Sequence, residues 1–279
     1  MSKLFLAALI LVLDFNRCNS QSLDSLVLLI KDMQRGENDS VRLASNEKFL
    51  IAFEKILLQN GSFSKNFDSL KNVSVQSPED KKFKIYTWVI PHYDGDVYNY
   101  YGFIQLHTDT SDILIRLNDS TSVIQKPESE KLNPERWLGA VYYSIIPINK
   151  SGKKYYTLLG WKGKDQKQSQ KIIEILYFDG NKVKFGYPLI KTGSVFRNRM
   201  IFSFNAQTSM TLHFDKKYKG IVFDHFTSNI NNSSETINGS EGTYDALKNK
   251  KGKWILIKNV DVGTKWEPSE NLPRPPKLN

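Results

Sequence analysis

Between residues 82 and 260 the sequence consists of short runs of aromatic and β-branched residues separated by turn residues. In the first run, residues 83–90, the side chains alternate as they do on the two faces of a strand, and Pro91 ends the run. The connections carry the Gly, Asn and Asp residues that tight turns require, for example in 149–152 and 179–181. This pattern predicts an antiparallel β meander and argues against most nucleotide-cofactor folds, in which strands alternate with long helices.

The same pattern predicts further strands along the chain. A sheet of about ten to twelve strands has to curl into a barrel, split into a sandwich or close like a propeller, because a flat open sheet of that size leaves its edges exposed. The pattern does not choose among these closures. Two polar segments, 125–136 and 229–242, are predicted to be surface loops. The further predicted strands are 98–107, 113–117, 138–148, 153–161, 171–178, 182–185, 199–205, 208–214, 220–224, 243–248 and 253–260.

Two amphipathic helices are predicted before the strands. Apolar residues recur at helical spacing over 23–33, and Gly36 is placed to end this first helix. A second apolar stripe covers 49–57, and Ser40 or Ser45 is a candidate N-cap for its helix. Two short helices with a tight link form a helical hairpin, which has to pack its apolar faces on something larger.

The predicted fold class is therefore α+β, with an N-terminal helical hairpin followed by a large antiparallel β meander. Along the chain we predict a signal peptide over residues 1–20, a helical segment over 21–75, an antiparallel β domain over 76–265 and a tail over 266–279. The tail is rich in proline, so we expect it to be extended and to stay outside the sheet.

The first 20 residues have the pattern of a signal peptide, with a basic start, an apolar run over 4–13 and a predicted cut after Ser20. The apolar run is too short to span a bilayer, which takes about 20 residues, so no transmembrane segment is expected after cleavage. Cys18 is the single cysteine, and the bulky and charged residues before it argue against lipidation. The mature chain is then free of cysteine, and we expect a periplasmic or extracellular protein.

The chain is basic, with 39 Lys and Arg residues against 29 Asp and Glu residues and a net charge of +10. Such a charge favours non-specific attraction to anionic lipids, acidic polysaccharides or nucleic acids, and indicates no specific nucleic-acid partner. The lysines occur mainly as pairs such as Lys153 and Lys154, next to predicted turns. We therefore interpret these pairs as solvated hairpin tips.

No residue pattern indicates a catalytic, metal or cofactor site. The four histidines lack the spacing of a zinc site, and no nucleophile-elbow motif is present, so no cofactor is expected and an enzyme is disfavoured. The closest acidic pairs, Asp94 with Asp96 and Asp109 with Asp112, are interpreted as turn residues. Carboxylates from different strands can still meet in a fold, so these pairs neither support nor exclude glycoside hydrolysis.

Aromatic residues are abundant, with 5 Trp, 13 Tyr and 16 Phe. Packing inside sheets is their usual role. Trp88 and Trp161 stand at the ends of strand-like runs, and we predict them as candidates for an exposed platform that stacks on a sugar ring or a base.

Four segments of the chain resemble a family of exported bacterial proteins of unknown function. The segments are 155–161, 176–180, 203–210 and 221–225. The resemblance covers most of the mature chain and implies a bacterial periplasmic or secreted protein, without an activity, a ligand or site residues.

Two hypotheses of function follow. The first is a non-enzymatic exported protein that binds a glycan, an envelope component or another protein. The second is a hydrolase of an extracytoplasmic polymer that uses carboxylates brought together by the fold. A deep cleft with two acidic groups on different strands would favour the hydrolase, and a shallow aromatic patch would favour the binding protein.

Overall fold

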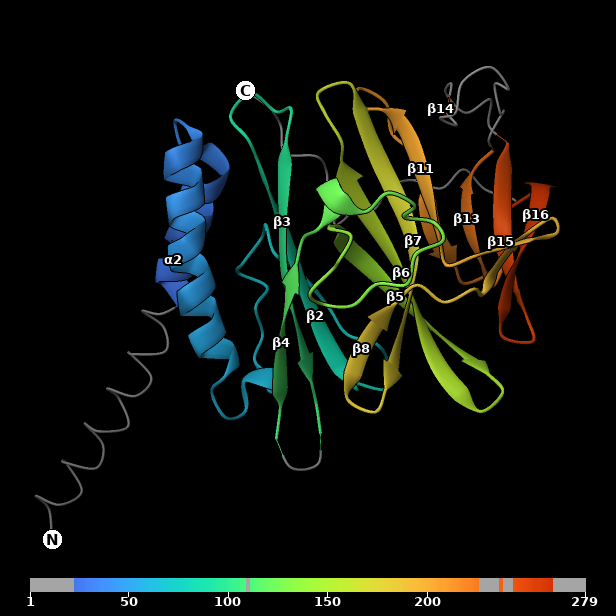
Figure 1. Ribbon diagram of the computed structural model, residues 1–279, viewed down its shortest axis with the longest axis horizontal. Helices are drawn as coiled ribbons and strands as arrows, with labels where there is room; N and C mark the ends of the chain where they lie inside the picture. The colour runs from blue at the N-terminus through green and yellow to red at the C-terminus, as the bar shows by residue number, and fades with distance from the viewer. Residues whose placement is uncertain (1–22, 109–110, 226–235, 238–242, 263–279) are drawn as a thin grey trace, which may run out of the picture. The chain divides into compact units, whose positions relative to one another are not determined.

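A computed structural model describes residues 23–108, 111–225, 236–237 and 243–262 (Figure 1). The predicted signal peptide with Cys18, the predicted tail and Asp109 lie outside the described residues. The chain divides into two compact units, of which the first ends at Asn72 and the second begins at Val73. Helices come first and antiparallel strands follow, with 17% helix and 48% strand, which confirms the α+β fold class.

The described part of the first unit, residues 23–72, contains two α-helices. The chain is helical from residue 23 to 35, Gly36 lies outside the helix, and α2 runs over Asp39–Leu57. Asn38 caps α2, because its side-chain oxygen accepts the N–H of Val41 at 3.0 Å. The candidate caps Ser40 and Ser45 were therefore wrong; both lie within the helix, and the cap has to precede it.

A short turn of helix, η1 (Ser62–Ser64), follows α2 in the first unit. Its N-cap, Gly61, has a φ of 74°, a left-handed conformation that suits glycine. Phe53 packs against Phe49 and Phe67, with ring centroids 5.2 Å and 5.4 Å away. These aromatic contacts hold the segment after α2 against the helix.

The strands of the second unit form three sheets, not one. Sheet 1 has the order β1-β2-β3-β4, with β1 (Ser74–Gln76), β2 (Phe83–Pro91), β3 (Tyr98–Leu106) and β4 (Ile113–Asn118). Sheet 2 has the order β14-β11-β7-β6-β5 with β8 beside β7; its strands are β5 (Val141–Lys150), β6 (Lys153–Gly163), β7 (Gln168–Asp179), β8 (Lys182–Phe185), β11 (Arg199–Asn205) and β14 (Thr236–Ile237).

Sheet 3 has the order β10-β9-β16-β15-β13-β12. Its pairings are antiparallel except for the parallel pair β9 and β16. Among the described strands, each sheet ends in edge strands and none closes on itself as a barrel. The strands of sheet 3 are β9 (Ile190–Thr192), β10 (Val195–Arg197), β12 (Leu212–Asp215), β13 (Gly220–Asp224), β15 (Tyr244–Lys250) and β16 (Lys253–Val260).

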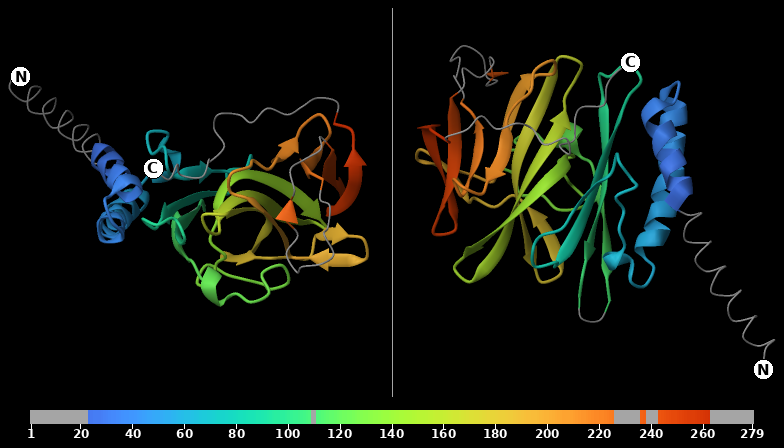
Figure 2. Two further views of the ribbon diagram at one scale, coloured as in Figure 1. Left: turned by 90° about the horizontal axis from the view of Figure 1, so that it is seen from above. Right: turned by 180° about the vertical axis from the view of Figure 1, so that it is seen from behind.

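Sheet 2 lies between sheets 1 and 3 (Figure 2). Successive side chains of a strand point to opposite faces of its sheet. Two neighbouring residues of β6 accordingly contact the two outer sheets. Tyr156 packs edge-on against Phe83 of sheet 1, with ring centroids 4.9 Å apart. Thr157 accepts a hydrogen bond of 2.7 Å from the indole N–H of Trp254 in sheet 3. All three sheets contribute to one continuous apolar core.

The connection between β4 and β5 contains η2 (Thr121–Val123) and the polar segment predicted as a loop. This loop is anchored from β11 and the residues before it. The side chain of Asn198 donates to the carbonyl of Ser129, and that of Arg199 donates to the carbonyls of Pro127 and Glu130. Within the described residues, no helix is both long enough and apolar enough to cross a bilayer.

Candidate functional site

Two hairpins of sheet 2 form a concave surface with a cavity of about 540 Å³. The turn between β5 and β6 is built on Ser151 and Gly152, with φ values of 49° and 76°, and the turn between β7 and β8 is built on Gly180, with a φ of 59°. These left-handed turns reverse the chain tightly, so the ends of the flanking strands meet at one place. The cavity lies among these strand ends and Tyr187, which follows β8.

Three tyrosine rings form one side of the cavity. Tyr155 and Tyr177 are opposite each other in the ladder of β6 and β7, with ring centroids 5.9 Å apart. The ring of Tyr187 lies 4.6 Å from that of Tyr155 and 5.2 Å from that of Tyr177. Tyr155 is buried, whereas Tyr177 and Tyr187 are half-buried and offer ring surface to the cavity.

The hydroxyl groups of this cluster are not equivalent. Burial raises the pKa of Tyr155 to about 12. A hydrogen bond with Tyr155 lowers the pKa of Tyr187, and the ammonium groups of Lys150, Lys153 and Lys131 lower it further. The hydrogen bond with Tyr155 and the nearby ammonium groups therefore favour the ionised form of the Tyr187 hydroxyl.

Lysines form the other side of the cavity. The ammonium of Lys150 lies 5.3 Å from the ring centroid of Tyr187, and Lys153 is exposed at the turn. Lys154 forms an ion pair with Asp80, with 2.7 Å between its Nζ and the Oδ2 of Asp80. Burial acts to raise the pKa of Asp80, but hydrogen bonds from Lys154 and Tyr156 outweigh it and lower that pKa.

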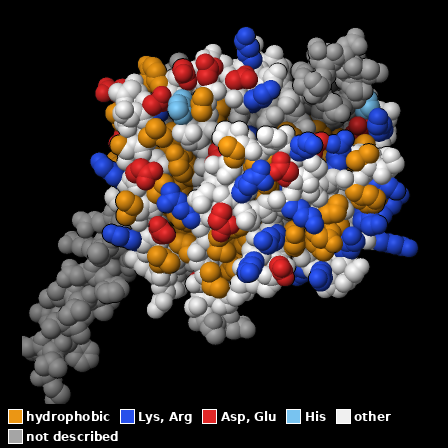
Figure 3. All heavy atoms as spheres, in the orientation of Figure 1, with side chains coloured by type: hydrophobic (Ala, Val, Ile, Leu, Met, Phe, Trp, Pro, Cys, Tyr) orange, Lys and Arg blue, Asp and Glu red, His pale blue; other side chains and the backbone are white. Residues whose placement is uncertain are grey.

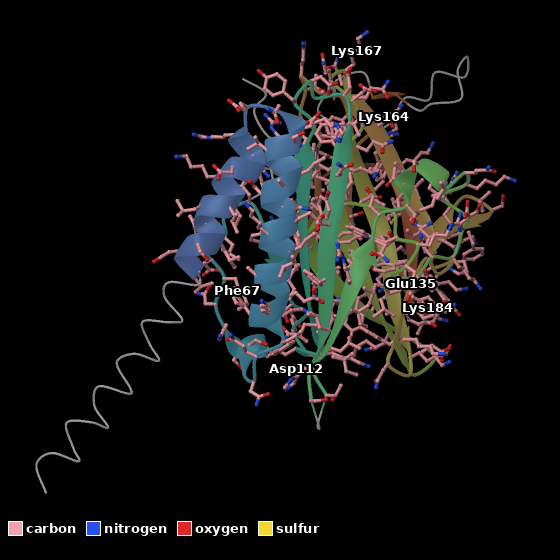
Figure 4. All side chains as sticks on the ribbon, turned by 60° about the vertical axis from the view of Figure 1, so that its left-hand side comes forward. Phe67, Asp112, Glu135, Lys164, Lys167 and Lys184 are labelled. Carbon is pink, nitrogen blue, oxygen red and sulfur yellow. The ribbon has the colours of Figure 1, made fainter. Side chains whose placement is uncertain are left out.

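Asp179 is the carboxylate among the residues that line the cavity. Because Lys150 and Lys153 also line it, the lining has an excess of positive charge. Further lysines lie close to it. Lys184 of β8, labelled in Figure 4, is opposite Tyr177 in the ladder of β7 and β8. On the right-hand part of the face shown in Figure 3, Lys and Arg side chains surround hydrophobic ones.

Neither of the predicted tryptophan platforms lines this cavity. Trp88 is 0% exposed on β2 and stacks on Tyr101, with ring centroids 5.8 Å apart. Trp161 is 2% exposed on β6 and packs edge-on against Tyr98 at 5.9 Å. The two indoles belong to different sheets and present no open ring face in this structure, and a role for them in binding stays a prediction.

Asp94 and Asp96 have the turn chemistry expected of them, whereas Asp109 of the other acidic pair lies outside the described residues. The side chain of Asp94 accepts the N–H of Asp96 at 3.0 Å, and the side chain of Asp112 lies 2.8 Å from the imidazole of His107. In the part of the chain that the structure describes, no group of three or more His, Cys, Asp or Glu side chains is arranged to hold a metal ion.

The fold and the site define a class: an α+β protein with three layered, mainly antiparallel sheets and a basic, tyrosine-lined cavity at two hairpin tips. No protein-family model, curated protein or solved structure matches the chain significantly. The function is therefore inferred from the geometry of the site.

Sequence reasoning missed part of this site. The pair Lys153 and Lys154 followed by Tyr155 and Tyr156 is a local signal of a basic and aromatic strand end. Tyr187 carries no such signal, because it stands outside any strand pattern and reaches the cluster through tertiary packing.

A buried lysine of β7, the strand that carries Tyr177, leads to a prediction on the pH dependence of stability. Lys171 of β7 is 6% exposed, its ammonium lies 4.6 Å from the ring centroid of Tyr143, and burial lowers its pKa to about 8 from 10.5. Between these two pH values the unfolded chain holds more protons than the folded one, so the free energy of unfolding rises with pH over that interval. Lys171→Met is expected to raise the free energy of unfolding at pH 7 by about 1–3 kcal/mol.

Urea unfolding of the two proteins at pH 7 and pH 9.5 tests this, because the gain from Lys171→Met has to shrink at the higher pH. Lys162→Met is the matched control. Burial also lowers the pKa of Lys162 to about 8, but its ammonium donates to Gly139 and Thr121 at 2.8 Å, so its removal is expected to destabilise. A gain from Lys171→Met that is the same at both pH values would contradict the electrostatic explanation.

Proposed function

We propose that the chain is an exported, non-enzymatic binding or envelope-associated protein that holds an anionic glycan in the cavity between its two hairpins. The observation that carries this proposal is the combination of half-buried Tyr177 and Tyr187 with the ammonium groups of Lys150 and Lys153 around one cavity. Tyrosine rings stack on the apolar faces of sugar rings, and lysines contact carboxylate, sulfate or phosphate substituents. The volume is in the usual range for small-ligand sites, about 300–1,000 Å³.

Binding fits the lining of this cavity better than hydrolysis does. Glycoside hydrolysis generally takes two carboxyl groups on either side of the scissile bond, and Asp179 is the carboxylate among the residues around the cavity. The polymer hydrolase remains the alternative hypothesis, and it would need a second acid from another part of the fold.

Export is part of the proposal and rests on the signal-peptide pattern of residues 1–20. The resemblance to exported bacterial proteins agrees with it. A periplasmic or extracellular location would place the cavity where anionic envelope glycans and secreted polysaccharides occur.

Binding of a polyuronate, with neutral dextran as the uncharged reference, tests the function. We expect saturable binding of the polyuronate and a loss of affinity of about 25-fold in the variant Lys150→Gln/Lys153→Gln, at about 1 kcal/mol for each lost charged contact. Tyr187→Ala is expected to lower the affinity by about tenfold through loss of stacking.

The variant Lys216→Gln/Lys217→Gln is the matched control, because it removes the same charge from an exposed turn of sheet 3. It is expected to keep the affinity within about twofold. An equal loss of affinity in this control would mean that binding depends only on the overall charge of the protein. Equal binding of dextran and the polyuronate would contradict an anionic ligand. Cleavage of the polymer during the assay would favour the hydrolase.

A further inference from the structure

The hairpin of β9 and β10 exposes two large apolar side chains at the edge of sheet 3. Val195 is 52% exposed and Phe196 is 44% exposed, and they are adjacent on the edge strand. Gly193 at the turn has a φ of 62° and open space around its α-carbon. The sequence pattern did not predict these strands, so this surface comes from the structure alone.

Two ammonium groups approach the exposed ring of Phe196. Lys191 is directly opposite Phe196 in the ladder, with its ammonium 5.7 Å from the ring centroid. Lys253 of β16 approaches the same ring at 5.2 Å. Lys126 and Arg197 line a recess of about 350 Å³ beside the hairpin, and Glu128 in that recess is ion-paired with Arg197.

The hairpin is held firmly on the sheet, so its tip is presented in one orientation. Ile190 of β9 pairs with Trp254 of β16, a residue of the core. Behind β10, the N–H of Asn198 donates to the carbonyl of Glu128 at 3.0 Å. A fixed tip loses little conformational entropy on binding a surface.

We propose that this hairpin docks the protein on a membrane surface that contains anionic phospholipids, with Val195 and Phe196 entering the interfacial region and Lys191 and Lys253 contacting lipid phosphates. An exposed apolar tip with two ammonium groups beside it matches the two attractions of such a surface, burial of apolar area and charge neutralisation. A stable protein partner usually buries about 800 Å² on each side, which is far more than two side chains provide. The proposal does not rest on the glycan site.

The test places an environment-sensitive fluorophore at the tip, as Val195→Cys in a Cys18→Ser background of the full chain. Vesicles of phosphatidylglycerol with phosphatidylcholine are compared with vesicles of phosphatidylcholine alone. The same fluorophore at Ser209→Cys, an exposed position between β11 and β12, is the matched control. A local label separates docking of the tip from binding by any other segment.

We expect the emission of the label at 195 to shift to shorter wavelength with the anionic vesicles only, and the label at 209 not to respond. Lys191→Gln/Lys253→Gln is expected to lower the partition coefficient by about 25-fold, at about fivefold for each lysine. Phe196→Ser is expected to lower it by about tenfold.

Three outcomes would overturn the proposal: no response at 195, an equal response at 195 and 209, or an equal response with neutral vesicles. Self-association without vesicles that Phe196→Ser abolishes would overturn it as well, in favour of pairing between edge strands of two copies.

Discussion

The variant Arg199→Met is expected to lower the free energy of unfolding by about 3–5 kcal/mol. Arg199 of β11 and Glu174 of β7 are neighbours in the ladder, and both are 0% exposed. The Nε of Arg199 donates to Glu174 at 2.7 Å, and its Nη2 lies 2.6 Å from the same oxygen as an ion pair. Removal of the arginine leaves a buried carboxylate without its counter-charge, which is costly in a medium of low polarity.

The loss should reach beyond the ion pair, because Arg199 also holds the connection between β4 and β5. Its Nη1 donates to the carbonyls of Pro127 and Glu130. The other oxygen of Glu174 accepts a hydrogen bond of 3.2 Å from Tyr142, whose hydroxyl accepts the indole N–H of Trp137 at 3.0 Å. The network therefore links sheet 2 to that connection, and we expect faster proteolysis of the connection in the variant.

Urea unfolding checks the magnitude. The matched control is Arg197→Met on β10, which breaks a partly exposed ion pair with Glu128 of the connection between β4 and β5 and is expected to cost less than about 1 kcal/mol. The double variant Arg199→Met/Glu174→Met should recover part of the loss, because it leaves no unpaired charge. A cost below about 1 kcal/mol for Arg199→Met would show that water reaches Glu174 in the folded state.

The second large effect is expected for Trp254→Ala, at about 3–5 kcal/mol. Trp254 of β16 is 1% exposed and belongs to the core. Its indole donates to Thr157 of β6, and its backbone N–H donates to Leu189 at 2.8 Å, so one residue connects sheets 2 and 3. Alanine leaves a large cavity between the sheets and an unpaired hydroxyl on Thr157.

Trp254→Phe separates these two contributions. Phenylalanine keeps most of the apolar volume and removes the hydrogen bond, so we expect a cost of about 1–2 kcal/mol. Circular dichroism during urea unfolding is suitable, because the measurement does not depend on indole fluorescence. Equal costs for the two variants would mean that the hydrogen bond, and not the packing, holds the sheets together.

Several strands were predictable to the residue. The expected ranges 182–185, 199–205, 220–224 and 253–260 agree with β8, β11, β13 and β16. Runs of aromatic and β-branched residues between turn residues determine such strands locally. β9 and β10 were missed, because strands of three residues are too short to show an alternation.

The site was less predictable than the strands. Lys153 and Tyr155 were visible as a basic and aromatic strand end, but a hairpin tip of this kind is usually only a solvated turn. Trp88 and Trp161 stand at the ends of strand-like runs in the sequence, but both are buried, since large rings contribute most to core packing.

The sequence by itself determined the α+β class, the hairpin turns and most strand bounds, because these depend on residues close together in the chain. Only the tertiary structure decided how the strands divide into three sheets, which lysines are buried and which are exposed, and that Tyr187 joins Tyr155 and Tyr177 around one cavity. These features depend on side chains that are distant in sequence, and their contacts are set by the packing of sheets and not by local pattern.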